Sequence, residues 1–139
     1  MAMVPDRRSR ALATTRLPRP NKHLTRMKIL LTVQDNSIAP RFDQATEIMI
    51  AEHDGQRLIG EPRTIILPHR SAEELSDLIV KEGVECVICG GIEESYHRFF
   101  VWKKITVYDG IIGGHTEALQ RCLAGQLLPG MVLPSALAH

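Results

Sequence analysis

The sequence contains few cysteines and aromatic residues, and it has no long apolar segment. Three cysteines in 139 residues do not form a disulfide framework, which points to a reducing compartment. No apolar run approaches the roughly 18 residues of a membrane helix, so we expect no membrane association. Residues 1–26 also lack the apolar core of a signal peptide. We therefore predict a cytoplasmic protein, and its length and 44% apolar content allow one folded domain.

The near-neutral net charge conceals a basic amino-terminal segment. Residues 1–26 carry seven basic side chains and one acidic side chain, whereas the remainder has ten basic and fifteen acidic groups. This segment has three prolines and no periodic apolar face, so we predict a disordered basic arm. It is either a nonessential arm, with a domain that truly starts at Met27, or a nucleic-acid-binding arm. No aromatic residue lies among its arginines, which disfavours the nucleic-acid interpretation.

Apolar periodicity begins at Met27 and first predicts antiparallel strands. Residues 28–33 form the first expected strand, and the polar turn 34–36 follows it. Residues 47–52 and 56–59 flank Asp54-Gly55, a pair typical of a two-residue hairpin in which both residues take positive φ. The second arm should continue through residues 64–67, after the interruption at Pro62.

The second half of the chain alternates between helices and strands. Ser71 and Glu74 have the spacing of a capping box, which predicts a helix that ends at Gly83. Further strands are expected at 84–89 and 105–108, with helices at about 93–101 and 116–124. This order requires parallel strands. We therefore predict an α/β fold with a mixed five-stranded sheet and helices on both faces, followed by a loose or docked tail over residues 128–139.

The loops after three strands supply the candidate binding residues. If the strands ending near residues 33, 89 and 108 are parallel, their carboxyl ends meet at one edge of the sheet. A thiolate and imidazoles are ligands that iron-sulfur species accept, so Cys89 and His115 are the candidate metal ligands. His115 also begins a predicted helix, where an anionic ligand is favoured. The loops gathered at this edge contain Asp35, Asn36, Cys89, Gly90, Gly91, His97, Gly113, Gly114 and His115.

Several of these residues also have a purely structural interpretation. Cys89 could be a small buried apolar residue, and His97 could be a solvated histidine on a helix. Cys86 and Cys89 form a C-x-x-C pattern, but residues three apart on a strand point to opposite faces. We therefore expect neither a bridge between them nor a zinc site, and we expect Cys122 to pack in the core.

The order of these elements resembles a known family. The segments that carry the resemblance are residues 27–30, Ile38-Ala39-Pro40-Arg41-Phe42, Asp54-Gly55, residues 83–92, Val107-Tyr108 and residues 124–127. Together they are similar to the nitrogenase iron-molybdenum cofactor accessory family, which includes small carriers of the cofactor and of its iron-sulfur precursor. The resemblance spans about residues 27–127. It implies a ribonuclease-H-like three-layer fold and, as ligand, an iron-sulfur or iron-molybdenum cluster.

The chain departs from this family at two places. Many members have a histidine between the proline and phenylalanine of the early loop, where this chain has Arg41. Arginine donates hydrogen bonds and cannot coordinate a metal, so Arg41 is expected to hold negative charge on the ligand. The small residues usual after the double glycine are replaced by the bulkier segment 93–100.

These observations favour a binding protein over an enzyme. Asp35 and Asp109 could approach one another, but no third and fourth acids complete a two-metal nuclease site. No nucleophile-and-base arrangement is readable from the sequence. We predict a small non-enzymatic binding protein, and the resemblance implies that it carries an iron-sulfur or iron-molybdenum cluster and works with cluster donor or acceptor proteins. The alternatives are a metal-free regulatory module that binds an anion or nucleotide, and a protein-interaction domain.

Overall fold

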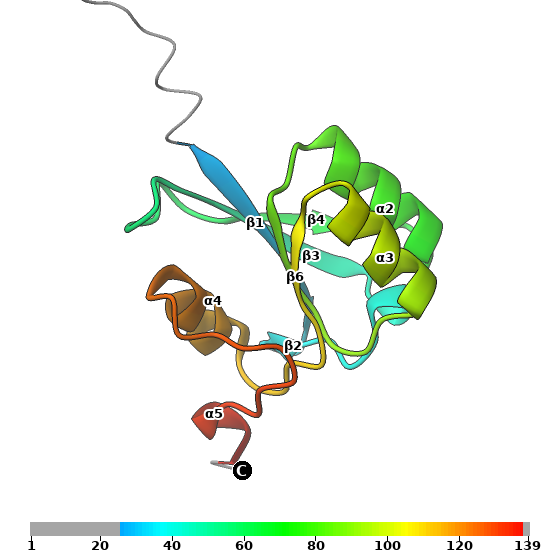
Figure 1. The fold of residues 1–139 in the computed structure, drawn as a ribbon. Helices are drawn as coiled ribbons and strands as arrows, with labels where there is room; N and C mark the ends of the chain where they lie inside the picture. Colours follow the sequence, from blue (N-terminus) through cyan, green and yellow to red (C-terminus); the bar gives the residue numbers. More distant parts are fainter. Residues whose placement is uncertain (1–25, 138–139) are drawn as a thin grey trace, which may run out of the picture.

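The computed structural model describes residues 26–137, which form a mixed sheet between two groups of helices (Figure 1). The sheet order is β4-β3-β1-β5-β6, and a short β2 pairs with β1. The strands are β1 (Met27–Gln34), β2 (Ser37–Ile38), β3 (Glu47–His53), β4 (Arg63–Ile66), β5 (Cys86–Ile88) and β6 (Thr106–Tyr108). The helices are the 3-10 helix η2 (Phe42–Gln44), α2 (Ala72–Lys81), α3 (Glu94–Trp102), α4 (His115–Leu123) and α5 (Pro134–Leu137). The predictions for the basic arm concern residues 1–25, outside the described part, and stay predictions.

Strand directions confirm the mixed α/β architecture. β1 pairs in parallel with β5, and β5 pairs in parallel with β6. β3 is antiparallel to both β1 and β4. The more specific ribonuclease-H-like assignment stays a prediction. Within the described part of the chain, no helix combines the length and apolar content needed to cross a bilayer.

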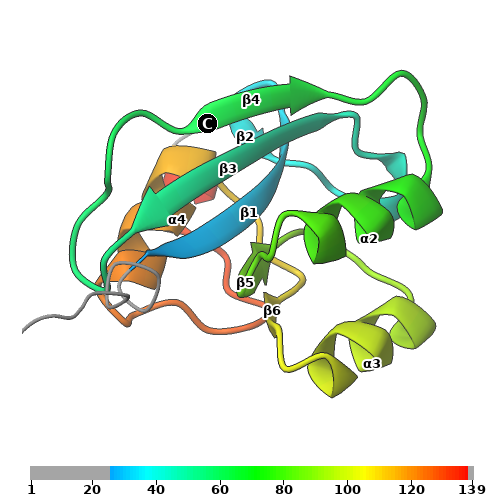
Figure 2. The same ribbon diagram turned by 90° about the horizontal axis from the view of Figure 1, so that it is seen from above.

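The sheet separates two apolar cores, because successive side chains of its buried strands point to opposite faces. α2 and α3 cover one face and α4 covers the other (Figure 2). Leu30 and Val87 pack toward α2 and α3, whereas Leu31 and Ile88 pack toward α4. The helices contribute Leu75, Ile79 and Phe100 to the first core, and Ala118 and Leu119 to the second.

The sheet has six strands rather than the five expected, because the polar turn after β1 leads directly into β2. Asp35 and Asn36 both adopt left-handed backbone conformations, with φ of 52° and 68°. Two consecutive positive φ values define a tight two-residue hairpin whose twist suits antiparallel strands. Val33 is therefore opposite Ile38, and β2 pairs with the end of β1. Asp and Asn tolerate this conformation better than most residues, which is a sequence signal for the hairpin.

The predicted strand over residues 56–59 is wrong. Only Leu58 forms a bridge, with His53, and β4 starts later, at Arg63. Gly55 takes positive φ, but Asp54 does not. The Asp54 side chain instead accepts hydrogen bonds from the amides of Gln56 and Arg57, at 3.0 and 2.9 Å. This local turn replaces the expected two-residue hairpin and lengthens the connection between β3 and β4.

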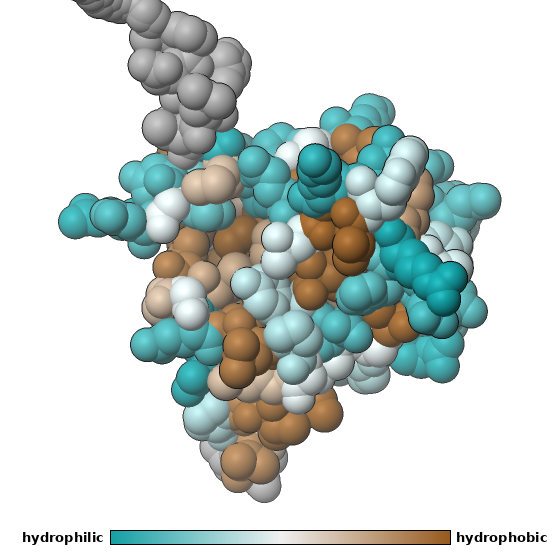
Figure 3. Space-filling view, in the orientation of Figure 1, coloured by the Kyte–Doolittle hydropathy of each residue, from teal (hydrophilic) through white to brown (hydrophobic). Residues whose placement is uncertain are grey.

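The carboxyl-terminal segment is docked, which is one of the two expected possibilities. Leu133 is fully buried in the core beneath α4, and Ile112 forms a bridge with Val132. The segment leaves apolar side chains on the surface over α5, at the lower end of the molecule in Figure 3. The exposed apolar residues of this region are Ile112, Leu128, Val132 and Leu137.

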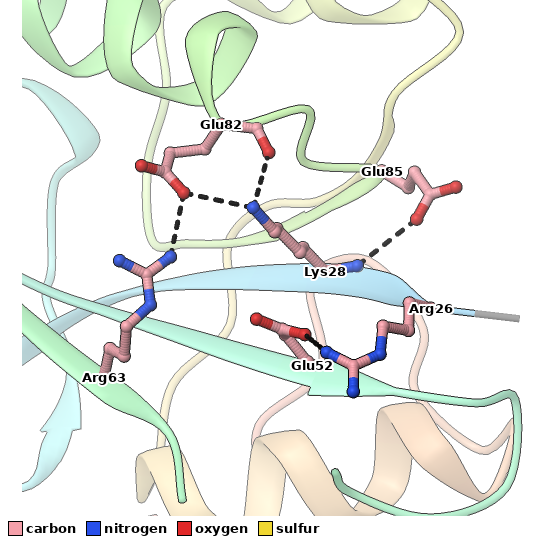
Figure 4. A network of polar contacts seen from close by, with 6 residues as sticks. All are labelled: Arg26, Lys28, Glu52, Arg63, Glu82 and Glu85. Atoms are coloured by element: carbon pink, nitrogen blue, oxygen red, sulfur yellow. Dashed lines mark hydrogen bonds and ion pairs between the residues drawn. The ribbon is translucent and has the colours of Figure 1, made fainter. Parts of the chain in front are cut away.

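A polar network joins the end of α2 to the sheet. The Glu82 carboxylate accepts hydrogen bonds from Lys28 on β1 and Arg63 on β4, at 3.2 and 2.8 Å (Figure 4). Lys28 Nζ also donates to the Glu82 carbonyl. At the other end of α2, the Ser71 hydroxyl accepts from the Glu74 amide at 3.1 Å, which confirms the Ser71 half of the predicted capping box. The Glu74 carboxylate instead lies 3.5 Å from His69 Nε2. Both ends of α2 are therefore fixed by specific contacts.

Candidate functional site

Three parallel strands place their following loops at one edge of the sheet, as expected. The carboxyl ends of β1, β5 and β6 lie together because the strands pair in parallel register. A mostly apolar hollow of about 320 Å³ opens at this edge. Its wall is made by Ile38, Pro40, Gly90, Gly91, Gly110, Ile111 and Ile112. The edge of the sheet thus offers a space large enough for a compact ligand.

His115 is held in one orientation at the start of α4. Its Nδ1 lies 2.8 Å from the carbonyl oxygen of Asn36, and its backbone amide donates to the same oxygen at 3.1 Å. A carbonyl can only accept, so Nδ1 carries the proton in the neutral ring. Nε2 then keeps its lone pair. This arrangement is typical of histidines that bind metals through Nε2.

Cys89 does not face the ligand edge with an accessible thiol. It is fully buried among the apolar residues beneath α2 and α3. Burial, with a smaller contribution from the nearby charge of Asp109, raises the pKa of Cys89 to about 12. A buried, protonated thiol is a poor metal ligand, because coordination requires the thiolate. This placement argues against Cys89 as a ligand and agrees with its structural interpretation.

The double glycine after β5 serves mainly for packing. A Cβ atom at Gly90 would collide with the carbonyl oxygens of Ala39 and Pro40. The Gly91 amide donates to Pro40 at 2.8 Å, and the Gly91 carbonyl accepts from Phe42 at 2.8 Å. The expectation that the Gly91 amide faces a ligand is therefore wrong, since a neighbouring loop already occupies it.

The second pair of glycines is also engaged within the chain. The Gly114 amide donates to the Ser135 hydroxyl at 2.8 Å. A Cβ atom at Gly113 would contact the side chain of Leu133. These contacts join the loop before α4 to the docked carboxyl-terminal segment. The Gly114 amide is consequently not available to an anion, contrary to expectation.

Arg41 and His97 lie on the surface near the hollow. Arg41 forms a two-point ion pair with Asp43, at 2.9 and 3.0 Å, and this hydrogen bonding lowers the pKa of Asp43. Arg41 lines a second hollow, of about 250 Å³, that shares Gly91 with the first. His97 Nε2 lies 3.9 Å from the Asp109 carboxylate, next to Gly110. Both residues are close enough in the fold to neighbour a ligand held at this edge.

Asp35 is separated from this group. It lines a polar hollow of about 360 Å³ together with Gln44, Glu47 and Arg70, on the β3 side of the hairpin. Asn36 contributes its backbone carbonyl, which accepts from His115. Among residues 26–137, no three or more His, Cys, Asp or Glu side chains gather as a metal site would require. A metal cluster bound here would take few side-chain ligands from this chain.

Sequence reasoning missed the apolar lining of the hollow and the role of Ser135. Ile38, Pro40, Ile111 and Ile112 come from loops or strand ends, where apolar residues are indistinguishable from core residues in the sequence. Ser135 lies in the segment described only as a tail. The prolines and glycines of that segment suggested irregular structure and gave no signal for its contact with Gly114.

Comparison with known proteins identifies similar sequences and folds. Residues 26–125 match the family described as "Dinitrogenase iron-molybdenum cofactor". No curated protein matches the sequence. A crystal structure from Methanocaldococcus jannaschii, described as a candidate dinitrogenase, is 24% identical with a TM-score of 0.59, and the alignment covers 73% of this chain and 91% of that one. An NMR structure of a candidate NifB protein from Thermotoga is 18% identical with a TM-score of 0.55, covering 74% and 92% of the two chains. These structural likenesses concern the fold.

Proposed function

Because the chain belongs to the dinitrogenase iron-molybdenum cofactor family, we propose that it is a small non-enzymatic carrier of the iron-molybdenum cofactor or of its iron-sulfur precursor. The cluster is the cargo, and proteins that build or receive it are the partners. One observation carries the proposal. His115 presents Nε2 as a ligand, because the Asn36 carbonyl fixes the proton on Nδ1.

The surroundings of His115 suit a cargo that must be released. One imidazole supplies a single coordination bond, whereas a resident cluster is usually held by about four protein ligands. The mostly apolar hollow at the same edge would shield one face of a cluster from water. Arg41 would leave its ion pair with Asp43 and pair instead with the negatively charged cluster, or with an organic acid attached to the cluster. His97 would add a second imidazole at the side of Asp109.

The metal-free alternative has less support from this geometry. A site for a simple anion or nucleotide phosphate needs unoccupied backbone amides. At this edge the amides of Gly91, Gly110, Gly114 and His115 already donate to other groups of the chain. A phosphate that used these four amides would therefore have to displace existing hydrogen bonds. The imidazole of His115 needs no such rearrangement.

The proposal is tested by anaerobic cluster binding with a His115→Ala variant. Two probes are used, a cluster reconstituted from ferric iron and sulfide and iron-molybdenum cofactor extracted from a nitrogenase. We expect the wild-type chain to retain iron through gel filtration and the variant to bind at least about tenfold more weakly, because it lacks the imidazole. Iron and molybdenum analysis and visible absorption measure retention.

His69→Ala is the matched control, because His69 is an exposed histidine that lies away from the site, beside Glu74 and before α2. It should bind both probes like the wild type. Equal retention by the wild type and both variants would contradict the role of His115. Failure of the wild-type chain to take up either probe would overturn the carrier function and favour the metal-free or protein-interaction alternatives.

A further inference from the structure

Two cysteines lie together at the end of the sheet opposite the proposed cluster site. Cys86 is the first residue of β5, and Cys122 lies in the last turn of α4. Their sulfur atoms are 3.8 Å apart, and both residues are half-buried. They are 36 positions apart in the sequence, so the fold alone brings them together. Cys122 was expected to be an ordinary core residue.

We propose that Cys86 and Cys122 form a reversible redox pair that closes to an intramolecular disulfide by exchange with a small disulfide such as oxidised glutathione. The closed form would join the sheet covalently to α4. This inference is independent of the cluster-carrying function. It concerns different residues at the other end of the same helix.

The distance between the two sulfurs suits this chemistry. A disulfide bond is about 2.05 Å long, so the sulfurs need to approach by less than about 2 Å. Rotation of the two side chains about their Cα–Cβ bonds supplies movements of this size. The approach that the two sulfurs require is therefore small compared with the reach of side-chain rotation.

A small oxidant can reach the pair from solvent. Cys86 and Cys122 line a hollow of about 240 Å³, and Met27, His53, Glu85 and Tyr108 are among its other lining residues. A buried thiol pair without such an opening would be inert toward a molecule the size of glutathione. Here both cysteines border the opening, on one side of the molecule.

The two thiols have different roles in the exchange. Either thiol can donate the hydrogen bond between the two sulfurs, and when Cys86 donates it, this bond lowers the pKa of Cys122. The same bond, together with burial, raises the pKa of Cys86. Cys122 is also the less buried of the two thiols, so we assign it as the attacking thiolate and Cys86 as the second thiol. The carboxyl-terminal position of Cys122 on α4 opposes a thiolate, so the exchange is expected to be slow.

The reaction balances without any further reagent. The Cys122 thiolate attacks one sulfur of the small disulfide, whose S–S bond breaks and releases one thiol. Cys86 then loses its proton and attacks the mixed disulfide at Cys122, which releases the second thiol. The protein loses two electrons and two protons, and the small disulfide is reduced to two thiols.

Cys89 provides an internal reference within the wild-type protein. It points to the opposite face of the sheet from Cys86 and is fully buried. This confirms that the two sulfurs of the C-x-x-C pattern face apart. Oxidation of the folded chain should therefore pair Cys86 with Cys122 and leave Cys89 as a free thiol.

The first experiment uses the wild-type full chain in a series of glutathione redox buffers at equilibrium. Remaining thiols are alkylated, and the digested protein is mapped by mass spectrometry. The expected result is a peptide pair linked through Cys86 and Cys122, with Cys89 fully alkylated, and full recovery of all three thiols on reduction. Bridges that include Cys89, or a pair that stays reduced in every oxidising buffer, would overturn the proposal.

The second experiment separates the attacking thiol from the second thiol. Cys86→Ala should accumulate a stable mixed disulfide with glutathione on Cys122, because no second thiol releases it. Cys122→Ala should accumulate far less adduct on Cys86, at least about tenfold less. Circular dichroism verifies that both variants are folded. Equal adducts on both variants would contradict the assigned roles.

Discussion

At the scale of single residues, two adjacent glycines in the loop after β5 have different roles. Gly90 packs directly against the carbonyl oxygens of Ala39 and Pro40, so any side chain at this position would collide with the backbone. Gly91 has room for a methyl group, since its nearest neighbour would be the Pro40 oxygen at 3.6 Å. The loop after β2 therefore packs closely against the loop after β5, and this close approach forms one wall of the hollow.

These contacts predict unequal effects of two equivalent substitutions. Gly90→Ala should destabilise the protein by about 3 kcal/mol or more, because backbone atoms must move to admit the new Cβ. Gly91→Ala should change stability by about 1 kcal/mol or less, since the added methyl meets ordinary contact distance. Urea denaturation measures both. A Gly90→Ala variant as stable as Gly91→Ala would show that the two loops do not pack as described.

Some residue-level features were readable from the sequence and others were not. His115 was identified as a candidate ligand because an imidazole at a predicted helix start is chemically distinctive. The hydrogen bond from His115 to the Asn36 carbonyl could not be predicted from the sequence. Every residue has a carbonyl, and only the folded structure determines which one His115 contacts. Cys89 was a predicted ligand as well, but its placement in the structure argues against that role. A thiol at the carboxyl end of a strand suggests chemistry, but the packing of α2 and α3 decides its accessibility.

At the scale of elements, the contacts of Glu82 couple α2 to two strands. Hydrogen bonding by Arg63 and then by Lys28 lowers the pKa of Glu82. A carboxylate whose pKa is lower in the folded state stabilises the protein above its unfolded pKa, and this contribution is lost as the pH falls through the folded pKa. The network should therefore matter at neutral pH and disappear in acid.

Glu82→Gln tests this network through the pH dependence of stability. At pH 7 the variant should be less stable than the wild type by about 1 kcal/mol, because two partly exposed ion pairs are weakened. The difference should begin to shrink as the pH falls below the ordinary glutamate pKa of about 4.5 and should vanish below the lowered pKa of the folded-state carboxylate. Thermal denaturation across this pH range measures it. Glu61→Gln, in the exposed loop before β4, is the control, and an equal pH response in both variants would contradict the argument.

Elements with strong local signals were predicted well, and those that depend on tertiary contacts were not. The Ser71 cap and the apolar spacing of α2 are local, and α2 formed as expected. The predicted strand at 56–59 had a suitable composition, but Asp54 stabilises a competing local turn. β2 is only two residues long and depends on its partner β1, so its own sequence could not reveal it.

At the scale of the whole molecule, the carboxyl-terminal segment extends the fold beyond the region shared with the family. The family match ends at residue 125, yet Leu133 is fully buried beneath α4. Ser135 caps the Gly114 amide with its hydroxyl and donates its own amide to Glu117. The segment therefore supports the loop and helix that carry His115.

Two leucines of this segment give a matched test of its contribution. Leu133→Ala should lower the free energy of unfolding by about 2–5 kcal/mol, because it leaves a cavity in the core. Leu137→Ala should change it by about 0.5 kcal/mol or less, since that side chain is 75% exposed. Urea denaturation distinguishes the two. If Leu133→Ala cost no more than Leu137→Ala, the segment would not be an integral part of the domain.

The contact between Asn36 and His115 also determines at what stage of synthesis the proposed binding site can form. The two residues are 79 positions apart, so the imidazole acquires its orientation only after the ends of the domain have met. During synthesis the Asn36 hairpin leaves the ribosome well before residue 115 is added, and domains generally fold as units. A nascent or truncated chain would lack the oriented imidazole. If the chain carries a cluster as proposed, loading would follow synthesis, because only the completely folded site would bind the cargo.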